Sequence, residues 1–214
     1  MSRKNAYLIA LLSLVTIMLQ ACLHNVVDVK NWIEAEKVGD VKGKFHFLED
    51  EGVKIYLPEV FKRYSSVEYL QLVDSIASKQ DYEYEVQQLK ARINMEGSLY
   101  IFLDEETRST YTVNAMPFQP IYKSDAQYLL GIIKMNQEKI AEQSDMEFTK
   151  IRANYTSSSG PQIFKAIYKI DNKKKHTTVF NTYYIVSYHK NTVFINLTTP
   201  FEVDFDMYLQ KMIL

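Results

Sequence analysis

Cysteine, glycine and proline are scarce in this chain of 214 residues, which has one, six and five of them respectively. A single cysteine excludes a disulfide within the chain and a zinc site built on Cys-x-x-Cys pairs. Neither a Gly-x-Gly-x-x-Gly motif nor a phosphate-binding loop occurs in the sequence. No charge dominates either, because 25 basic and 26 acidic residues give a net charge of −1 at pH 7. This balance argues against nucleic acid as a partner.

The remaining composition is that of a folded protein. Hydrophobic residues make up 47% of the chain and charged residues 24%, close to globular averages. No repeat appears, and no linker divides residues 44–214. We therefore expect one globular domain over residues 44–214.

The first residues form a separate segment. Arg3 and Lys4 precede an almost wholly apolar run of 14 residues, Ala6–Leu19, interrupted by Ser13 and Thr16. This run is shorter than the roughly 20 residues that a membrane-spanning helix needs. A positive start followed by a short apolar run is typical of a secretory signal peptide.

The only cysteine of the chain, Cys22, follows this run after Gln20 and Ala21. The sequence Leu19-Gln20-Ala21-Cys22 resembles the cleavage box of bacterial lipoprotein signal peptides. The resemblance implies cleavage between Ala21 and Cys22 and acylation of the Cys22 sulfur and amino group, which together anchor a protein stably. Residues 1–21 would then be the signal peptide and residues 22–43 the lipidated tether. An ordinary signal peptide or an N-terminal membrane anchor is the alternative.

The localisation that follows from this resemblance is the bacterial cell envelope. The lipid would hold the protein at the periplasmic face of the inner or the outer membrane. No acidic run directly follows Cys22, because Asp28 comes too late, and this favours retention in the periplasm.

The body of the chain alternates between strand and helix patterns. Short strands are expected around the turns at 49–52 and 104–106. Helices are expected from Ser65, with a Ser65–Glu68 capping box, then over 82–93 and over about 125–145, the last opened by Ser124 and Gln127. Four further strands should cover 150–155, 164–170, 179–188 and 193–197, and a helix should follow Pro200.

Short turns between neighbouring strands predict a largely antiparallel sheet with helices packed on its faces, that is, an α+β fold. The hairpin that ends in Tyr56-Leu57-Pro58, and the last strand pair running into 201–214, resemble the PsbP-like sandwich fold. That family includes an extrinsic subunit of the photosynthetic oxygen-evolving complex and many bacterial lipoproteins. The resemblance implies an accessory or binding role without naming a ligand.

No catalytic or metal-binding motif emerges from the sequence. Ser157, Ser158 and Ser159 lack the first glycine of a nucleophile elbow. The four histidines, His24, His46, His176 and His189, show no helical metal-pair spacing. His46 is expected to face solvent, opposite Phe45 and Phe47.

The acidic cluster Glu202, Asp204 and Asp206 is more simply explained by the start of the last helix than by a cation site. We therefore assign no catalytic residue, metal or cofactor.

One segment stands out as a contact surface. Residues 114–123 contain Pro117 and Pro120 and carry Met116, Phe118 and Tyr122, and exposed apolar side chains on such a loop can mark a binding site. We interpret the lysines 173–175 as a solvated hairpin tip.

The sequence hypothesis is a lipid-anchored, non-enzymatic envelope protein that binds a protein partner or a small ligand. An envelope hydrolase with dispersed catalytic residues is the alternative.

Overall fold

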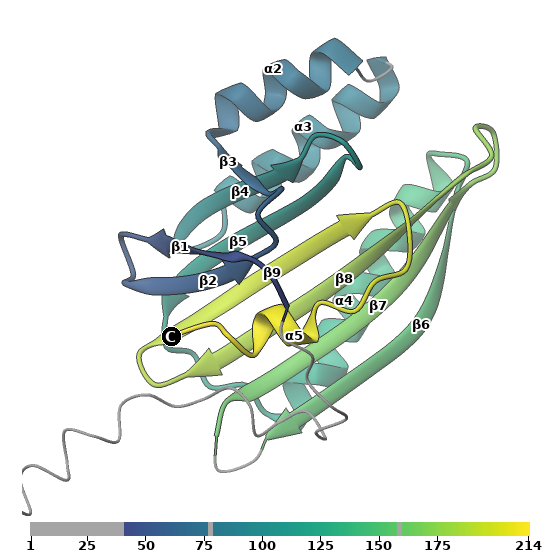
Figure 1. Ribbon diagram of the computed structural model, residues 1–214. Coiled ribbons are helices and arrows are strands. Elements are labelled where there is room, and N and C mark those ends of the chain that lie inside the picture. The colour runs from purple at the N-terminus through teal and green to yellow at the C-terminus, as the bar shows by residue number, and fades with distance from the viewer. Residues whose placement is uncertain (1–40, 77–78, 158–159) are drawn as a thin grey trace, which may run out of the picture.

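A seven-stranded antiparallel sheet forms the centre of the computed structural model, which describes residues 41–76, 79–157 and 160–214 (Figure 1). In spatial order its strands are β3 (Lys62–Tyr64), β4 (Ser98–Asp104), β5 (Ser109–Pro117), β9 (Asn191–Thr199), β8 (Thr177–Tyr188), β7 (Gln162–Asn172) and β6 (Met146–Ser157). The chain is therefore α+β with a largely antiparallel sheet, as the sequence predicted. The β5–β9 pair joins the early hairpin to the late strands, and no local pattern specifies that pair.

One face of this sheet is covered by a hairpin and the end of the chain, and we call it the closed face. The hairpin consists of β1 (Lys44–Leu48) and β2 (Val53–Leu57), which form a sheet of their own. Beside the hairpin lies the short helix α5 (Asp206–Leu209), as Figure 1 shows. The largest cluster of buried apolar residues lies here and includes Leu57, Phe102, Tyr111, Ile195 and Leu209.

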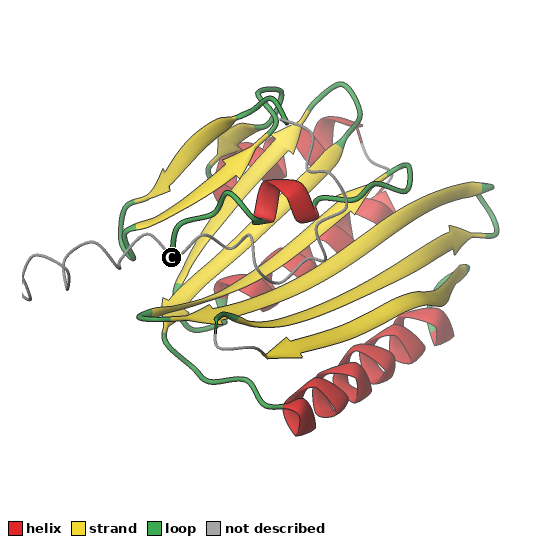
Figure 2. Cartoon of the chain, turned by 60° about the horizontal axis from the view of Figure 1, so that its bottom comes forward, coloured by secondary structure: helices red, strands yellow, loops and turns green. Residues whose placement is uncertain are grey.

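The opposite face carries three helices in two separate places, and we call it the helix face. The helices α2 (Ser66–Ile76) and α3 (Lys79–Ile93) pack against β4 through Tyr69, Val73, Leu89 and Ile101. The long helix α4 (Lys123–Glu142) packs against β6, β7 and β8 at the other edge (Figure 2). Two smaller apolar clusters result, and the positions of Thr110, Asn181 and Thr198 on the middle strands belong to neither cluster.

The local signals of the early helices agree with the structure. The backbone N–H of Ser65 donates to the Glu68 carboxylate at 2.8 Å, and the Glu68 N–H donates to Ser65 Oγ at 3.2 Å, so this capping box is confirmed. After α3, Gly97 has a φ of 89°, and a Cβ there would lie 1.9 Å from the Ala115 carbonyl oxygen. Glycine is thus required where the chain turns into β4.

The capping box predicted for α4 is wrong in its residues. The Asp125 carboxylate, rather than Ser124 with Gln127, accepts a hydrogen bond from the backbone N–H of Tyr122 at 2.7 Å. A carboxylate here satisfies one free backbone donor and also carries the negative charge favoured at a helix start.

The end of the chain also differs from the prediction. Instead of a helix over 201–214, the structure has only the four residues of α5, followed by a backbone bridge between Ile213 and Lys54 of β2. Two hydrogen bonds of 2.9 and 2.8 Å form this bridge. The helical spacing of the apolar residues does not produce a longer helix here, because the end of the chain pairs with the hairpin instead.

The described chain enters the fold at the closed face. The Val41 carbonyl accepts hydrogen bonds from the Tyr56 hydroxyl and from Lys211 Nζ, both at 3.2 Å. The Lys42 carbonyl accepts a hydrogen bond from the Tyr208 hydroxyl at 3.4 Å. Residues 1–40, with Ala21, Cys22 and the predicted signal peptide, lie outside the described residues. None of the helices in the described ranges combines the length and the apolar character that a bilayer-crossing helix requires.

Candidate functional site

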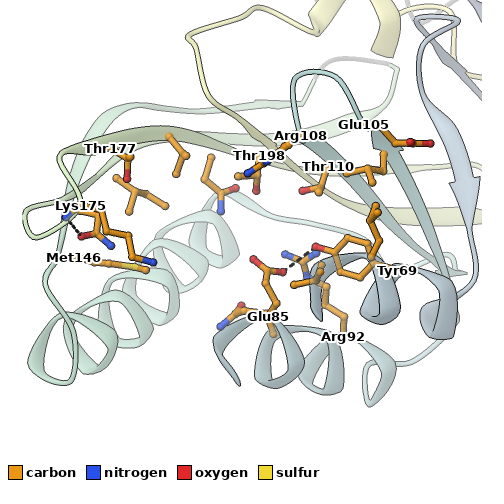
Figure 3. Close-up of a pocket in the computed structure, with 18 residues that line it drawn as sticks. Tyr69, Glu85, Arg92, Glu105, Arg108, Thr110, Met146, Lys175, Thr177 and Thr198 are labelled. Carbon is orange, nitrogen blue, oxygen red and sulfur yellow. Dashed lines mark hydrogen bonds between the residues drawn. The ribbon is translucent and has the colours of Figure 1, made fainter. Parts of the chain in front are cut away.

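A cavity of about 520 Å³ lies on the helix face, beside α2 and α3 and over the middle strands (Figure 3). We call it the groove. Its volume falls within the roughly 300–1,000 Å³ of small-molecule sites. Six strands or strand ends line it together with the two helices, from Leu103 of β4 to Met146 of β6.

The floor of the groove is a row of polar side chains that runs across the strands. Thr110 of β5 pairs with Thr198 of β9, and Thr198 pairs with Asn181 of β8. All three line the groove. Apolar side chains would normally fill this layer of a central sheet face. These three side chains belong to neither apolar cluster of the helix face, so polar residues are compatible with the fold here.

Asn181 is an incompletely satisfied group on this floor. Its side chain is buried, with 8% exposure, and its Nδ2 donates to the Tyr183 hydroxyl at 3.3 Å. Its Oδ1 has no hydrogen-bond partner, and the same holds for Oδ1 of Asn196 in β9 on the same face. A buried polar atom without a partner costs about 1–3 kcal/mol. These two buried oxygens are therefore the unsatisfied polar atoms beneath the groove floor.

The helix side of the groove carries an ordered set of polar groups. The Tyr69 hydroxyl of α2 donates to the Glu85 carboxylate of α3 at 2.9 Å, a bond that Figure 3 shows as a dashed line. Burial, then the nearby negative charge of Glu85, raises the pKa of Tyr69 far above its usual range. Arg92 of α3 donates to Oγ1 of Thr112 at 2.7 Å, which fixes its guanidinium over the sheet.

The turn between β4 and β5 forms the mouth of the groove. Arg108 in this turn has a left-handed backbone, with a φ of 60°, and its exposed side chain lines the groove. Glu105 accepts hydrogen bonds from the Tyr64 hydroxyl and, at 3.1 Å, from Lys62 Nζ. These bonds lower the pKa of Glu105.

These pKa shifts indicate what the groove can do chemically. The pKa of Tyr69 moves up and that of Glu105 moves down, so both groups move away from neutrality. A general acid or base works best with a pKa near the working pH. Neither histidine nor cysteine is among the described residues that line the groove. Neither Tyr69 nor Glu105 is therefore matched to proton transfer at neutral pH.

The segment predicted as a contact loop is only partly a loop. Met116 belongs to β5 and is buried, with 8% exposure, so it differs from the expectation of an exposed side chain. Phe118 and Tyr122 lie between β5 and α4 with 43% and 59% exposure. Whether these two form a contact site stays a prediction.

The predicted solvent position of His46 is wrong. Its ring packs edge-on against Phe102 with centroids 4.8 Å apart, and its Nε2 is buried without a partner. Burial is the main cause that lowers the pKa of His46. His176 and His189 occupy turn positions with φ of 53° and 50°, at the two ends of β8.

The acidic cluster near the C-terminus is organised around a lysine. Lys165 Nζ lies 2.6 Å from Asp206 and 3.5 Å from Asp204. The Tyr184 hydroxyl also donates to Asp206, at 2.9 Å. Across the described ranges, no group of three or more His, Cys, Asp or Glu residues could hold a metal ion. His24, Ser158 and Ser159 lie outside the described residues.

The groove residues were missed from the sequence, although a signal was present. Polar residues alternate with apolar ones in β5 and β9, and both turn out to be central strands. The polar half of such a strand normally faces solvent, and the sequence cannot tell whether a helix covers it. No sequence motif around Arg92 or Arg108 marks either arginine as a binding residue.

No protein-family model matches the chain, and no curated protein matches it. Two solved structures have a similar fold. The first is the cyanobacterial PsbP (CyanoP) of Synechocystis sp. PCC 6803, with 13% identity and a TM-score of 0.49, over 84% of this chain and 96% of that chain. The second is the Ran-binding protein Mog1p of Saccharomyces cerevisiae, with 10% identity and a TM-score of 0.42, over 76% and 79% of the two chains. The sequence layout also resembles the PsbP-like fold. At 13% identity, the likeness to CyanoP concerns the fold alone.

Proposed function

We propose that this chain is a lipid-anchored protein of the bacterial envelope whose folded domain is a non-enzymatic binding module. The groove on the helix face is its binding site for a small ligand or a segment of a protein partner. Lipid on Cys22 holds the module at the membrane. The anchor rests on the sequence Leu19-Gln20-Ala21-Cys22 behind an apolar run, and the binding site rests on the groove.

The observation that carries the binding role is the polar floor of the groove. A folded domain ordinarily covers the face of its central strands, or exposes it where something else binds. Here Thr110, Thr198 and Asn181 line a cavity of about 520 Å³ beside α2 and α3.

The position of the tether is compatible with this arrangement. The described chain enters at the closed face, where Val41 contacts Tyr56 and Lys211. The groove opens on the opposite face of the same sheet. The first described residues and the groove therefore lie on opposite faces of the sheet.

The hydrolase alternative is disfavoured by the groups in the groove. An active site would be expected to hold titratable groups whose pKa values move toward neutrality. The two shifted groups here move in the other direction. A reproducible turnover activity of the purified protein that is lost when groove residues are substituted would overturn the non-enzymatic role.

The anchor is tested by replacing Cys22 with serine. The wild-type protein should fractionate with membranes at the mature size and incorporate radiolabelled palmitate. The Cys22→Ser variant should lose the label and accumulate at the unprocessed size. If this variant is still found in membranes at the mature size, the lipoprotein assignment is wrong.

The groove is tested by site-specific photo-crosslinking in living cells. A benzoylphenylalanine at Gln88, which lines the groove, should give a defined adduct that mass spectrometry identifies. The same group at Tyr128, 71% exposed on α4 and outside the groove, is the matched control. Equal adducts at both positions, or none at Gln88, would contradict a binding site in the groove.

A further inference from the structure

The groove combines three chemical features that together specify a class of ligand. We propose that it binds an amphipathic anion, a small molecule with one carboxylate or phosphate group and an apolar body. This inference rests on the proposed function, because it names the ligand of the same site.

The anionic group of the ligand is inferred from the arginines. Arg92 comes from α3 and Arg108 from the β4–β5 turn, and both line the groove (Figure 3). Arg92 is oriented by its bond of 2.7 Å to Thr112, and one such bond leaves further guanidinium donors. Among the described residues, Arg108 has no ion-pair partner. Guanidinium groups are the side chains best matched to carboxylate and phosphate.

The acids of the groove do not cancel this preference. Glu85 accepts the Tyr69 hydroxyl at 2.9 Å. Glu105 is held by Tyr64 and by Lys62, and Lys62 does not line the groove. In Figure 3 the Glu105 carboxylate points away from the cavity. Both acids therefore have partners of their own, while the arginine side of the groove keeps donors for a ligand.

The apolar body of the ligand is inferred from the remaining lining. Between the charged groups the groove is walled by aliphatic side chains of four elements, namely Leu72, Val73, Leu103, Ile170 and Val179. An inorganic anion would leave this apolar surface in contact with water. A chain or ring attached to the anion would cover it, and burial of apolar area favours binding.

A hydrogen-bonding group on the ligand beside the apolar body is the third expected feature. Thr110, Thr198 and Asn181 lie side by side on the floor of the groove. A threonine hydroxyl can donate or accept, so a hydroxyl or amide next to the apolar body would find a partner on this floor.

Binding is tested with four probes on the full chain in phosphatidylcholine nanodiscs. Decanoate and decyl phosphate carry the proposed combination, whereas decanol lacks the anion and inorganic phosphate lacks the apolar body. Hydrogen exchange followed by mass spectrometry reports protection of α3 and of the floor strands β8 and β9, and empty nanodiscs correct for partitioning. We expect decanoate, decyl phosphate or both to protect these segments at concentrations at least tenfold below those of decanol and phosphate.

Arg108→Gln should weaken the anionic probes about tenfold and leave decanol unchanged. Lys174→Gln is the matched control, because Lys174 is an exposed lysine of the neighbouring hairpin tip that does not line the groove. Protection by decanoate alone identifies a fatty-acid-like ligand, and protection by decyl phosphate alone identifies a phosphate ester.

Two results would overturn the ligand class while leaving the groove as a binding site. One is decanol that protects as well as decanoate, and the other is a specific Gln88 adduct in cells with no protection by any probe. If the Gln88 adduct is also absent, the proposed function fails together with the ligand class.

Discussion

The two faces of the seven-stranded sheet differ in what covers them and in what their strands carry. On the closed face, the hairpin β1–β2 and the end of the chain seal a continuous apolar cluster around Phe102, Tyr111 and Ile195. On the helix face, α2–α3 and α4 pack at opposite edges, and the strands between them carry Thr110, Thr198 and Asn181. The same strands thus serve a core on one side and a groove on the other.

This difference separates stability from binding within single strands. Side chains alternate between the two faces of a strand, so neighbouring residues of β9 have opposite roles. Burial of apolar surface on the closed face supplies the main favourable free energy of folding. The helix face can then hold incompletely satisfied polar groups at a tolerable cost.

The largest expected effect is a truncation on the closed face, compared with a change on the groove floor of the same strand. Ile195, with 2% exposure, packs in the main cluster, and Ile195→Ala should reduce the free energy of unfolding by about 2–5 kcal/mol. Thr198→Val should change it by less than about 0.5 kcal/mol. Urea denaturation followed by circular dichroism measures both. Equal losses would show that the groove floor is part of the core.

The next effect concerns the charged pair on the closed face. Lys165 has a side-chain exposure of 9% and lies 2.6 Å from Asp206. Asp206→Asn leaves the buried ammonium without its nearest carboxylate, which should cost about 3 kcal/mol or somewhat less, because Asp204 remains 3.5 Å away. Asp204→Asn, at a carboxylate with 70% exposure, is the control and should cost less than about 1 kcal/mol. A similar loss of unfolding free energy in both variants would mean that Asp206 stabilises the fold no more than the exposed Asp204 does.

The smallest effect is a pH dependence that arises on the closed face. Burial lowers the pKa of His46 below its usual value of 6.5, so the unfolded chain takes up the proton first as the pH falls. Stability should therefore decrease as the pH drops from 7 through 6.5 toward the lowered pKa. Thermal unfolding between pH 7 and 5 should show a smaller decrease for His46→Gln than for the wild type. Parallel curves for the two proteins would contradict a lowered pKa of His46 in the folded state.

The fold could be predicted where local patterns decide it. Alternation correctly placed β7, β8 and β9, and the capping box of Ser65 and Glu68 correctly marked the start of α2. The prediction failed where distant parts of the chain compete with a local pattern. Residues 205–213 have helical spacing, but Ile213 pairs with Lys54 about 160 residues away in sequence. In β6, a bulge between Lys150 and Arg152 leaves Ile151 exposed although it continues the apolar alternation.

His46 illustrates why the candidate site was harder to predict than the strands. Alternation separates Phe45 and Phe47 from His46, but it does not say which side faces inward. The register pairs His46 with Ile55 and Leu48 with Val53, and the burial of these aliphatic partners turns His46 inward and both phenylalanines outward. The groove depends in the same way on which strands the helices cover, and that is a property of the packing.

The central claim is that the helix face binds and the closed face stabilises, and two substitutions in β9 test it together. Thr198→Phe should fill the groove floor, remove the adduct at Gln88 and leave the urea midpoint close to that of the wild type. Ile195→Ala should lower the midpoint and keep the adduct in the folded protein. A Thr198→Phe protein that is folded and still gives the full Gln88 adduct would contradict the account.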